Sequence, residues 1–169
     1  MSDNGKIHLP PEKYILDITC GARSMWFDKN HDSTVYCDQR KEDHQFGEHG
    51  QKISISPDYI CKWSNLPFED ETFRLVVWDP PHMLNASEKS WMVKKYGTLK
   101  EDWEEEFRKG FAECMRVLKP QGVLIFKWAE CQIPFRKVIE IFGQQPLFGH
   151  TTAKSGRTFW ATFMKEAGM

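Results

Sequence analysis

A carboxylate followed by two prolines and a histidine, Asp79-Pro80-Pro81-His82, closes the apolar run 75–78. Four apolar residues in a row predict a short buried strand. Each proline lacks a backbone donor and fixes φ at about −65°, so the tip of this strand is stiff. Ligands of open α/β sheets bind at this carboxyl end. Asp79 and the nearby carbonyl oxygens form an acceptor cluster suited to gripping an NH₂ group, unless the motif simply ends a strand.

A second group of residues is suited to binding a cofactor. Cys20-Gly21 follows a first apolar strand, 14–19, and a small turn there lets a ligand approach the backbone. Asp38 ends a second strand, 34–37, where an acidic side chain typically accepts hydrogen bonds from ribose hydroxyls. Neither Gly-x-Gly-x-x-Gly nor the Gly-Lys-Ser/Thr phosphate loop occurs. The pattern favours a cofactor that has a ribose but no phosphates.

Composition narrows the class of protein. The chain has 169 residues, 40% of them hydrophobic, which is enough for one domain with a substantial core. Its net charge of −1 means that any nucleic-acid contact must come from a local basic patch. Five scattered cysteines without a Cys-x-x-Cys pair favour reduced thiols over disulfides or a metal site. No apolar stretch is long enough to span a membrane and no signal peptide opens the chain, so we expect a cytoplasmic protein.

The order of elements predicts an α/β fold. We expect one domain over 1–169 whose first 13 residues form an extended arm, with a long connection at 83–100. The expected helices are 22–29, 39–46, 101–118 and 133–142, and the expected strands are 14–19, 34–37, 59–63, 74–78, 123–128, 147–151 and 158–164. Strands alternate with helices until about residue 145, and two strands then follow. This order predicts a mostly parallel seven-stranded sheet with one antiparallel strand and helices on both faces.

An ordered set of motifs carries a family resemblance. It comprises Leu-Asp-x-x-Cys-Gly at 16–21, Asp38, Leu-Pro-Phe-x-Asp-x-x-Phe at 66–73, Asp-Pro-Pro at 79–81 and Arg-Val-Leu-Lys-Pro-x-Gly-Val-Leu at 116–124. Over residues 14–165, the chain resembles class I S-adenosylmethionine-dependent methyltransferases, which have a Rossmann-like fold. The run 20–29, taken with Asp-Pro-Pro-His, is similar to a group of small phage and mobile-element methyltransferases.

The resemblance implies cofactor-binding roles for residues at the first two strands. Gly21 and its neighbours Thr19 and Cys20 would face the methionine part of S-adenosylmethionine. Asp17 would anchor the amino group of that part, and Asp38 would hold the ribose hydroxyls.

Recognition of the adenine departs from the family pattern. Many relatives have an acidic residue just before Leu-Pro-Phe, where this chain has Lys62-Trp63. Asp58 or the ring face of Trp63 would then substitute, although Trp63 also suits simple core packing.

The resemblance also implies roles at the Asp-Pro-Pro tip, and Asp79, Pro80, Pro81 and His82 are the expected catalytic residues. The motif is similar to that of relatives that methylate exocyclic amines. By this resemblance, Asp79 and the Pro80 carbonyl would accept hydrogen bonds from the NH₂ group and direct its lone pair at the sulfonium methyl group. Asp79, which also lies beside the cofactor, would stabilise the positive charge that develops on nitrogen. His82 replaces a larger aromatic ring, and it would either stack on a base or relay a proton.

Substrate contacts are expected from residues further along the chain. The connection 83–100 interleaves lysines with rings, including Lys94 and Tyr96, which suits a nucleic-acid strand, although a solvated lid over the cofactor is equally consistent. Lys127 and Trp128 end the fifth strand, and His150 lies on the final hairpin. Each of these three suits either a substrate contact or ordinary packing at a strand end.

The leading hypothesis is a methyltransferase that uses S-adenosylmethionine, releases S-adenosylhomocysteine and methylates an exocyclic amine, with N6 of adenine in DNA as the first candidate. The expected partner is therefore a nucleic acid, with no membrane or metal involved. Methylation of RNA or of a small molecule is the second hypothesis. A non-catalytic module that binds S-adenosylmethionine is the third. The sequence does not specify an oligomeric state.

Overall fold

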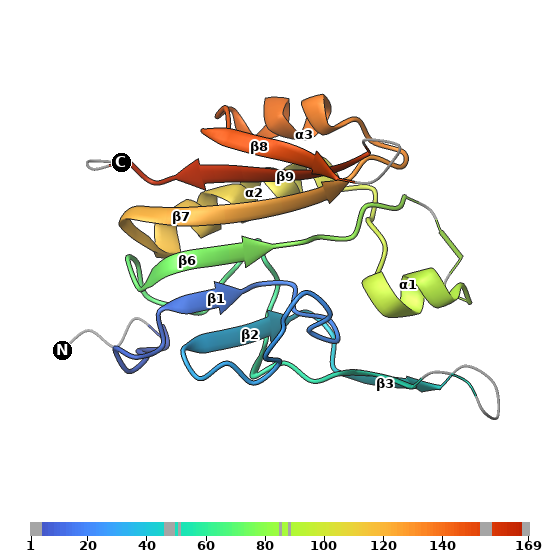
Figure 1. The fold of residues 1–169 in the computed structure, drawn as a ribbon, viewed down its shortest axis with the longest axis horizontal. Coiled ribbons are helices and arrows are strands. Elements are labelled where there is room, and N and C mark those ends of the chain that lie inside the picture. Colours follow the sequence, from blue (N-terminus) through green and yellow to red (C-terminus); the bar gives the residue numbers. More distant parts are fainter. Residues whose placement is uncertain are drawn as a thin grey trace.

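Seven strands form one sheet in the order β5-β2-β1-β6-β7-β9-β8 in the computed structural model (Figure 1). The structure describes residues 5–45, 50, 52–84, 86–87, 89–152 and 157–166. The strands of the sheet are β1 Ile15–Asp17, β2 Thr34–Asp38, β5 Tyr59–Ile60, β6 Phe73–Trp78, β7 Leu118–Ala129, β8 Phe148–Thr152 and β9 Thr158–Met164. Strand β9 is antiparallel to both β7 and β8, whereas the pairs from β5 to β7 are all parallel. The predicted sheet, mostly parallel with one reversed strand, is confirmed.

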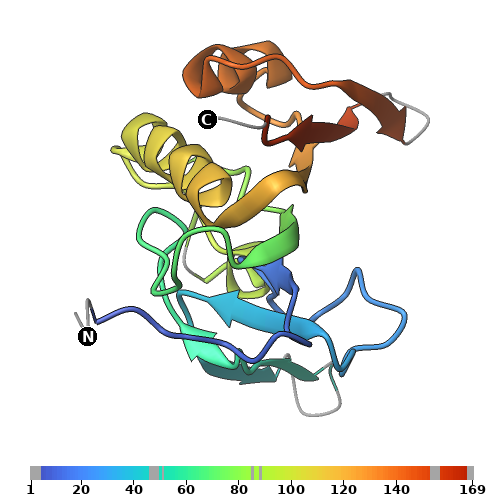
Figure 2. The same cartoon turned by 90° about the vertical axis from the view of Figure 1, so that its left-hand side faces the viewer.

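Two helices pack on the same side of this sheet, α2 (Trp103–Val117) and α3 (Phe135–Phe142) (Figure 2). Helix α2 buries Phe107, Phe111 and Cys114, which recur at helical spacing along one face. Phe107 lies 5.3 Å from the ring of Trp78 on β6 and 5.6 Å from Trp128 on β7, measured between ring centroids. An aromatic core therefore joins α2 to the two central strands.

Helix α2 comes close to the sheet because residue 110 is glycine. A Cβ atom at Gly110 would lie 2.8 Å from ring atoms of both Trp63 and Trp78. Any larger residue at this position would push the helix away from the two indole rings.

The helix predicted over 22–29 is wrong. Residues 20–33 form turns, in which Arg23 has a left-handed φ of 54°. The Arg23 guanidinium donates to the carbonyls of Lys29 (2.7 Å) and Ser56 (3.0 Å), so contacts distant in sequence hold this loop. A polar segment this short gains little from helix formation by itself.

The helix predicted over 39–46 is also wrong for residues 39–45, the part of it that the structure describes. Strand β3 (Glu42–Gln45) pairs instead with β4 (Lys52–Ile55) in an antiparallel hairpin. Ile53 and Ile55 are buried and alternate with exposed residues, which is the period of a strand. Phe46 and Gly47, the expected end of the helix, lie outside the described residues.

The face of the sheet opposite α2 and α3 is covered differently from the expectation of helices on both faces. The 20–33 loop covers β1 and β2 there, with Trp26 packed edge-on against Tyr36. Further along this face, Leu75, Val77, Val123 and Ile125 are only partly buried, and no helix of the described chain packs on them. The two helices missing from the first third of the chain account for this difference.

Two segments flank the sheet. The 83–100 connection contains the short helix α1 (Trp91–Tyr96), which lies beyond the carboxyl ends of the central strands (Figure 1). Within the N-terminal arm, Ile7 donates its backbone N–H to the Pro67 carbonyl at 2.7 Å. No helix among the described residues has the length and apolarity needed to cross a membrane.

Candidate active site

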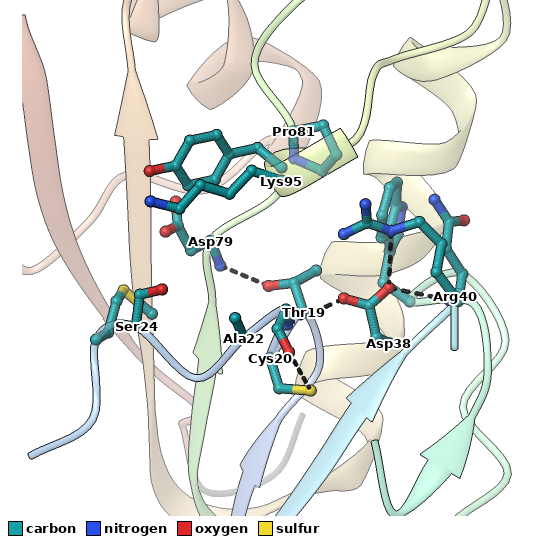
Figure 3. Close-up of a pocket in the computed structure, with 14 residues that line it drawn as sticks. Thr19, Cys20, Ala22, Ser24, Asp38, Arg40, Asp79, Pro81 and Lys95 are labelled. Carbon is teal, nitrogen blue, oxygen red and sulfur yellow. Dashed lines mark hydrogen bonds and ion pairs between the residues drawn. The ribbon is translucent and has the colours of Figure 1, made fainter. Parts of the chain in front are cut away.

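A pocket lies at the carboxyl ends of β1, β2 and β6, beneath α1 (Figure 3). The loop after β1, the end of β2, the tip after β6 and the end of α1 each supply part of its wall. Its lining residues are Thr19, Cys20, Gly21, Ala22, Ser24, Met25, Asp38, Gln39, Arg40, Trp63, Asp79, Pro81, Lys95 and Tyr96. Parallel pairing of β1 with both β2 and β6 brings these ends together, as the sequence predicted.

Asp38 holds two loops of the pocket together. Its Oδ2 accepts from the Gly21 backbone N–H at 3.0 Å, and its Oδ1 accepts from the backbone N–H and the Nε of Arg40 at 3.0 and 3.2 Å. Gly21 has a φ of +50°, and no atom lies within 4 Å of where its Cβ would be. The carboxylate thus faces an open turn that a ligand can approach closely.

Asp79 lies at the tip of β6 and is fixed by two neighbouring strands. Its backbone N–H donates to Thr19 Oγ1 at 2.9 Å, and its Oδ2 accepts from Lys127 Nζ at 2.7 Å. Lys127 lies beside Asp79 because the residues just before them, Phe126 on β7 and Trp78 on β6, are paired in the sheet. Burial raises the pKa of the Asp79 carboxyl, and the Lys127 charge opposes that rise. No described residue donates to its other oxygen, Oδ1, and Asp79 lines the pocket.

The two prolines and His82 continue the tip. Pro80 and Pro81 are buried, and Pro81 packs against Gly97, where an added Cβ would lie 3.1 Å from Pro81 Cγ. The His82 ring lies 6.4 Å from the rings of Tyr96 and Trp128. Burial lowers the pKa of His82, so its imidazole is neutral at pH 7.

Asp17 lies under the pocket and is not part of its lining. Its side chain accepts from Trp26 Nε1 at 2.7 Å and from the Thr19 backbone N–H at 3.1 Å. Burial raises the pKa of this carboxyl to about 7. Asp17 therefore supports Thr19 from below, and Trp26 separates it from solvent.

Two other candidate cofactor residues are packed tightly. Cys20 is buried, and burial raises the pKa of its thiol, so it is no nucleophile. Trp63 lines the pocket but is only 7% exposed, and its Nε1 has no hydrogen-bond partner among the described residues. Asp58, the alternative for adenine, accepts from the Tyr36 backbone N–H at 2.9 Å and does not line the pocket.

The expected substrate residues are only partly brought together. Lys127 and Tyr96 lie beside Asp79 and the pocket. Trp128 is fully buried on the helix side and donates to the Ile133 carbonyl at 3.0 Å. His150 lies two strand spacings from Lys127, about 10 Å, across β9. Lys94 lines a neighbouring groove and not the pocket.

Sequence reasoning missed three residues of this site. Arg40 joins Asp38 to α1, because its Nη1 donates to the Lys94 carbonyl at 3.1 Å. Trp26 closes the space over Asp17, and Lys95 lines the pocket from α1 (Figure 3). The only available signal for Arg40 was its position two residues after Asp38, since the other contacts depend on the tertiary fold.

Comparison with known proteins adds information about the fold. No protein-family model and no curated protein matches this sequence. Among solved structures, a S-adenosylmethionine-dependent methyltransferase from Methanosarcina mazei is similar with a TM-score of 0.54 and 13% identity, covering 94% of both chains. The 1,6-didemethyltoxoflavin-N1-methyltransferase of Burkholderia thailandensis, solved with its substrate and S-adenosylhomocysteine, has a TM-score of 0.50 and 12% identity, covering 91% of this chain and 71% of the other.

The chain has the fold of the class I S-adenosylmethionine-dependent methyltransferases. Fold alone does not fix the reaction, because the cyclase SpnF is equally similar, with a TM-score of 0.55 and 11% identity over 92% of this chain and 75% of SpnF. The activity must therefore be argued from the site. The similarity to phage and mobile-element enzymes stays a prediction.

We predict that Asp17 makes stability depend on pH. In the unfolded chain this carboxyl titrates near 3.8, whereas the native state keeps its proton up to about 7. Between these values the native state binds more protons, so the free energy of unfolding falls as pH rises. Relative to the non-titrating variant Asp17→Asn, the wild type should lose roughly 4 kcal/mol between about pH 4 and pH 7. Urea unfolding at a series of pH values measures this, and a constant difference between the two proteins would contradict it.

Proposed function

We propose that this protein is a S-adenosylmethionine-dependent methyltransferase that methylates an exocyclic amine, N6 of adenine in DNA. The observation that supports this best is the position of Asp79. A partly buried carboxylate lies at the tip of β6, next to a pocket whose opposite wall carries Asp38. One of its oxygens accepts from Lys127, and no described residue donates to the other. This arrangement has an acceptor for an amine at one end and an acceptor for ribose hydroxyls at the other.

The residues present fit the proposed cofactor. Asp38 suits the ribose, the open turn at Gly21 suits a closely approaching methionine chain, and the buried ring of Trp63 suits the adenine. The enclosed space is about 50 Å³, below the roughly 300–1,000 Å³ of a typical small-molecule site. Entry of the cofactor therefore requires the side chains that α1 contributes, Lys95 and Tyr96, to move outward.

The chemistry assigned to the chain is positioning and charge stabilisation. Bound S-adenosylmethionine would supply a methyl group on a positively charged sulfur. Asp79 Oδ1 and the Pro80 carbonyl would each accept a hydrogen bond from one N–H group of the amine. Its lone pair would then be directed at the methyl carbon. During such a transfer, positive charge would develop on the substrate nitrogen beside the Asp79 carboxylate, which would stabilise it. The surplus proton then passes to Asp79 or to neutral His82 and on to water.

A small-molecule amine or ring nitrogen is the second candidate acceptor. The neighbour from Burkholderia thailandensis is named as an N1-methyltransferase of 1,6-didemethyltoxoflavin, and 91% of this chain aligns with 71% of that longer chain. Incubation with isotope-labelled donor and DNA, RNA or cell extract, followed by mass spectrometry of the products, separates these acceptors. Label in N6-methyladenine of DNA is the expected result, and label only in a small molecule would reject the DNA assignment.

We predict that Asp79→Ala lowers methyl transfer by about 10²–10³-fold, because it removes the acceptor that stabilises the developing charge. The affinity for S-adenosylmethionine, measured by calorimetry, should change little, because the variant leaves Asp38 and the Gly21 turn unchanged. Asp32→Ala, an exposed carboxylate on the loop after the pocket residues, is the matched control and should behave as wild type. Wild-type turnover in Asp79→Ala would refute the assigned chemistry.

We also predict that Lys127 sets the pH range of activity. Asp79 must be ionised to accept from an amine, so activity falls as pH drops through its pKa, which burial raises and Lys127 lowers. Lys127→Met removes the charge that lowers the pKa of Asp79, so it should move the acid limb of kcat/KM to higher pH. Lys127→Arg keeps the ion pair and should leave the limb nearly in place. An unshifted acid limb in Lys127→Met would show that Asp79 is not the titrating group.

A further inference from the structure

A basic groove lies beside the cofactor pocket, between the β3–β4 hairpin and α1. Its volume is about 820 Å³. Four cationic side chains line it, Arg40, Lys62, Lys94 and Lys100, together with Glu42 and His44 from the hairpin. The protein as a whole has a net charge of −1, so this concentration of positive charge is local.

Two of the lysines that line the groove, Lys62 and Lys100, have no ion-pair partner among the described residues. Both are exposed. Glu42 already pairs with His44 at 2.7 Å, and Arg40 pairs with Asp38 at 3.2 Å. Like charges that line one concave surface repel one another, and a bound polyanion relieves that repulsion.

The groove is adjacent to the cofactor pocket. Gln39 and Arg40 line both the groove and the cofactor pocket. Helix α1 lies between the two, with Lys95 and Tyr96 on the pocket side and Val93 and Lys94 on the groove side. Gly97, at the end of α1, lines the groove and packs against Pro81 of the Asp-Pro-Pro tip. Helix α1 is only about 9 Å long. A chain-like ligand can therefore lie in the groove while one of its units passes the end of α1 and reaches Asp79.

We propose that this groove binds the sugar–phosphate backbone of a single DNA strand whose target adenine enters the site at Asp79. The inference rests on the proposed function and assigns the place where its substrate is held. The groove is open to solvent and has a volume of about 820 Å³, which leaves room for a few nucleotides of one strand. Enzymes that modify a base act on single strands or extrude the base from the duplex, so one strand at the site suffices.

The test measures the salt dependence of binding. A fluorescein-labelled single-stranded oligodeoxynucleotide containing adenine is titrated by anisotropy between 50 and 200 mM salt. Each phosphate contact on a single strand contributes about 0.7 to the slope of log affinity against log salt. The double variant Lys62→Ala/Lys100→Ala loses two such contacts, so its slope should be smaller than that of the wild type by about 1.4. The affinity that it loses relative to the wild type should therefore be about sevenfold greater at 50 mM salt than at 200 mM salt. Lys119→Ala, which removes an exposed lysine at the start of β7, is the control and should keep the wild-type slope.

Methyl transfer assays separate the groove from the chemistry. In the double variant, kcat/KM should fall for the oligonucleotide and stay unchanged for free 2′-deoxyadenosine. An unchanged salt slope, an equal loss with the free nucleoside, or tighter binding to RNA of the same sequence would each overturn the groove assignment. Groove-dependent binding of DNA without methylation of any adenine would uphold the groove and reject the proposed function.

Discussion

A partly buried carboxylate, Asp79, which the proposed chemistry requires to be ionised, is the constraint on which this account depends. Removing Asp79 from water favours its neutral form, and the ion pair with Lys127 at 2.7 Å opposes that effect. The pair exists because β6 and β7 run parallel in a register that places residues 79 and 127 side by side. The sheet register and the chemistry of the tip are thus linked through one contact.

The rest of the site is arranged around the same edge of the sheet. Thr19 fixes the backbone of Asp79, Asp17 fixes Thr19 from below, and Asp38 fixes the turn at Gly21. Arg40 then joins Asp38 to the carbonyl of Lys94 on α1. A ligand that bonds to Asp38 competes with Arg40, so occupation of the ribose site and the position of α1 are coupled. The same arginine lies where the pocket meets the basic groove.

Local patterns in the sequence were sufficient for the seven strands of the main sheet and for two of the site residues. The apolar run before Asp79 and the acidic residue ending β2 each depend on neighbours in the chain, and both lie where they were predicted. The ion pair of Lys127 joins residues 48 positions apart and follows only from the sheet register. The 20–33 loop was misread because Arg23 bonds to Ser56, which local helix propensity does not reveal. The hairpin was misread because the buried residues that define it, Ile53 and Ile55, lie on the partner strand.

The most direct measurement is a crystal structure of the protein with S-adenosylhomocysteine. The account predicts the ribose hydroxyls at Asp38, the sulfur facing Asp79 across the pocket, and Lys95 and Tyr96 displaced outward. A product molecule bound elsewhere on the chain, with Asp79 remote from the sulfur, would contradict the account.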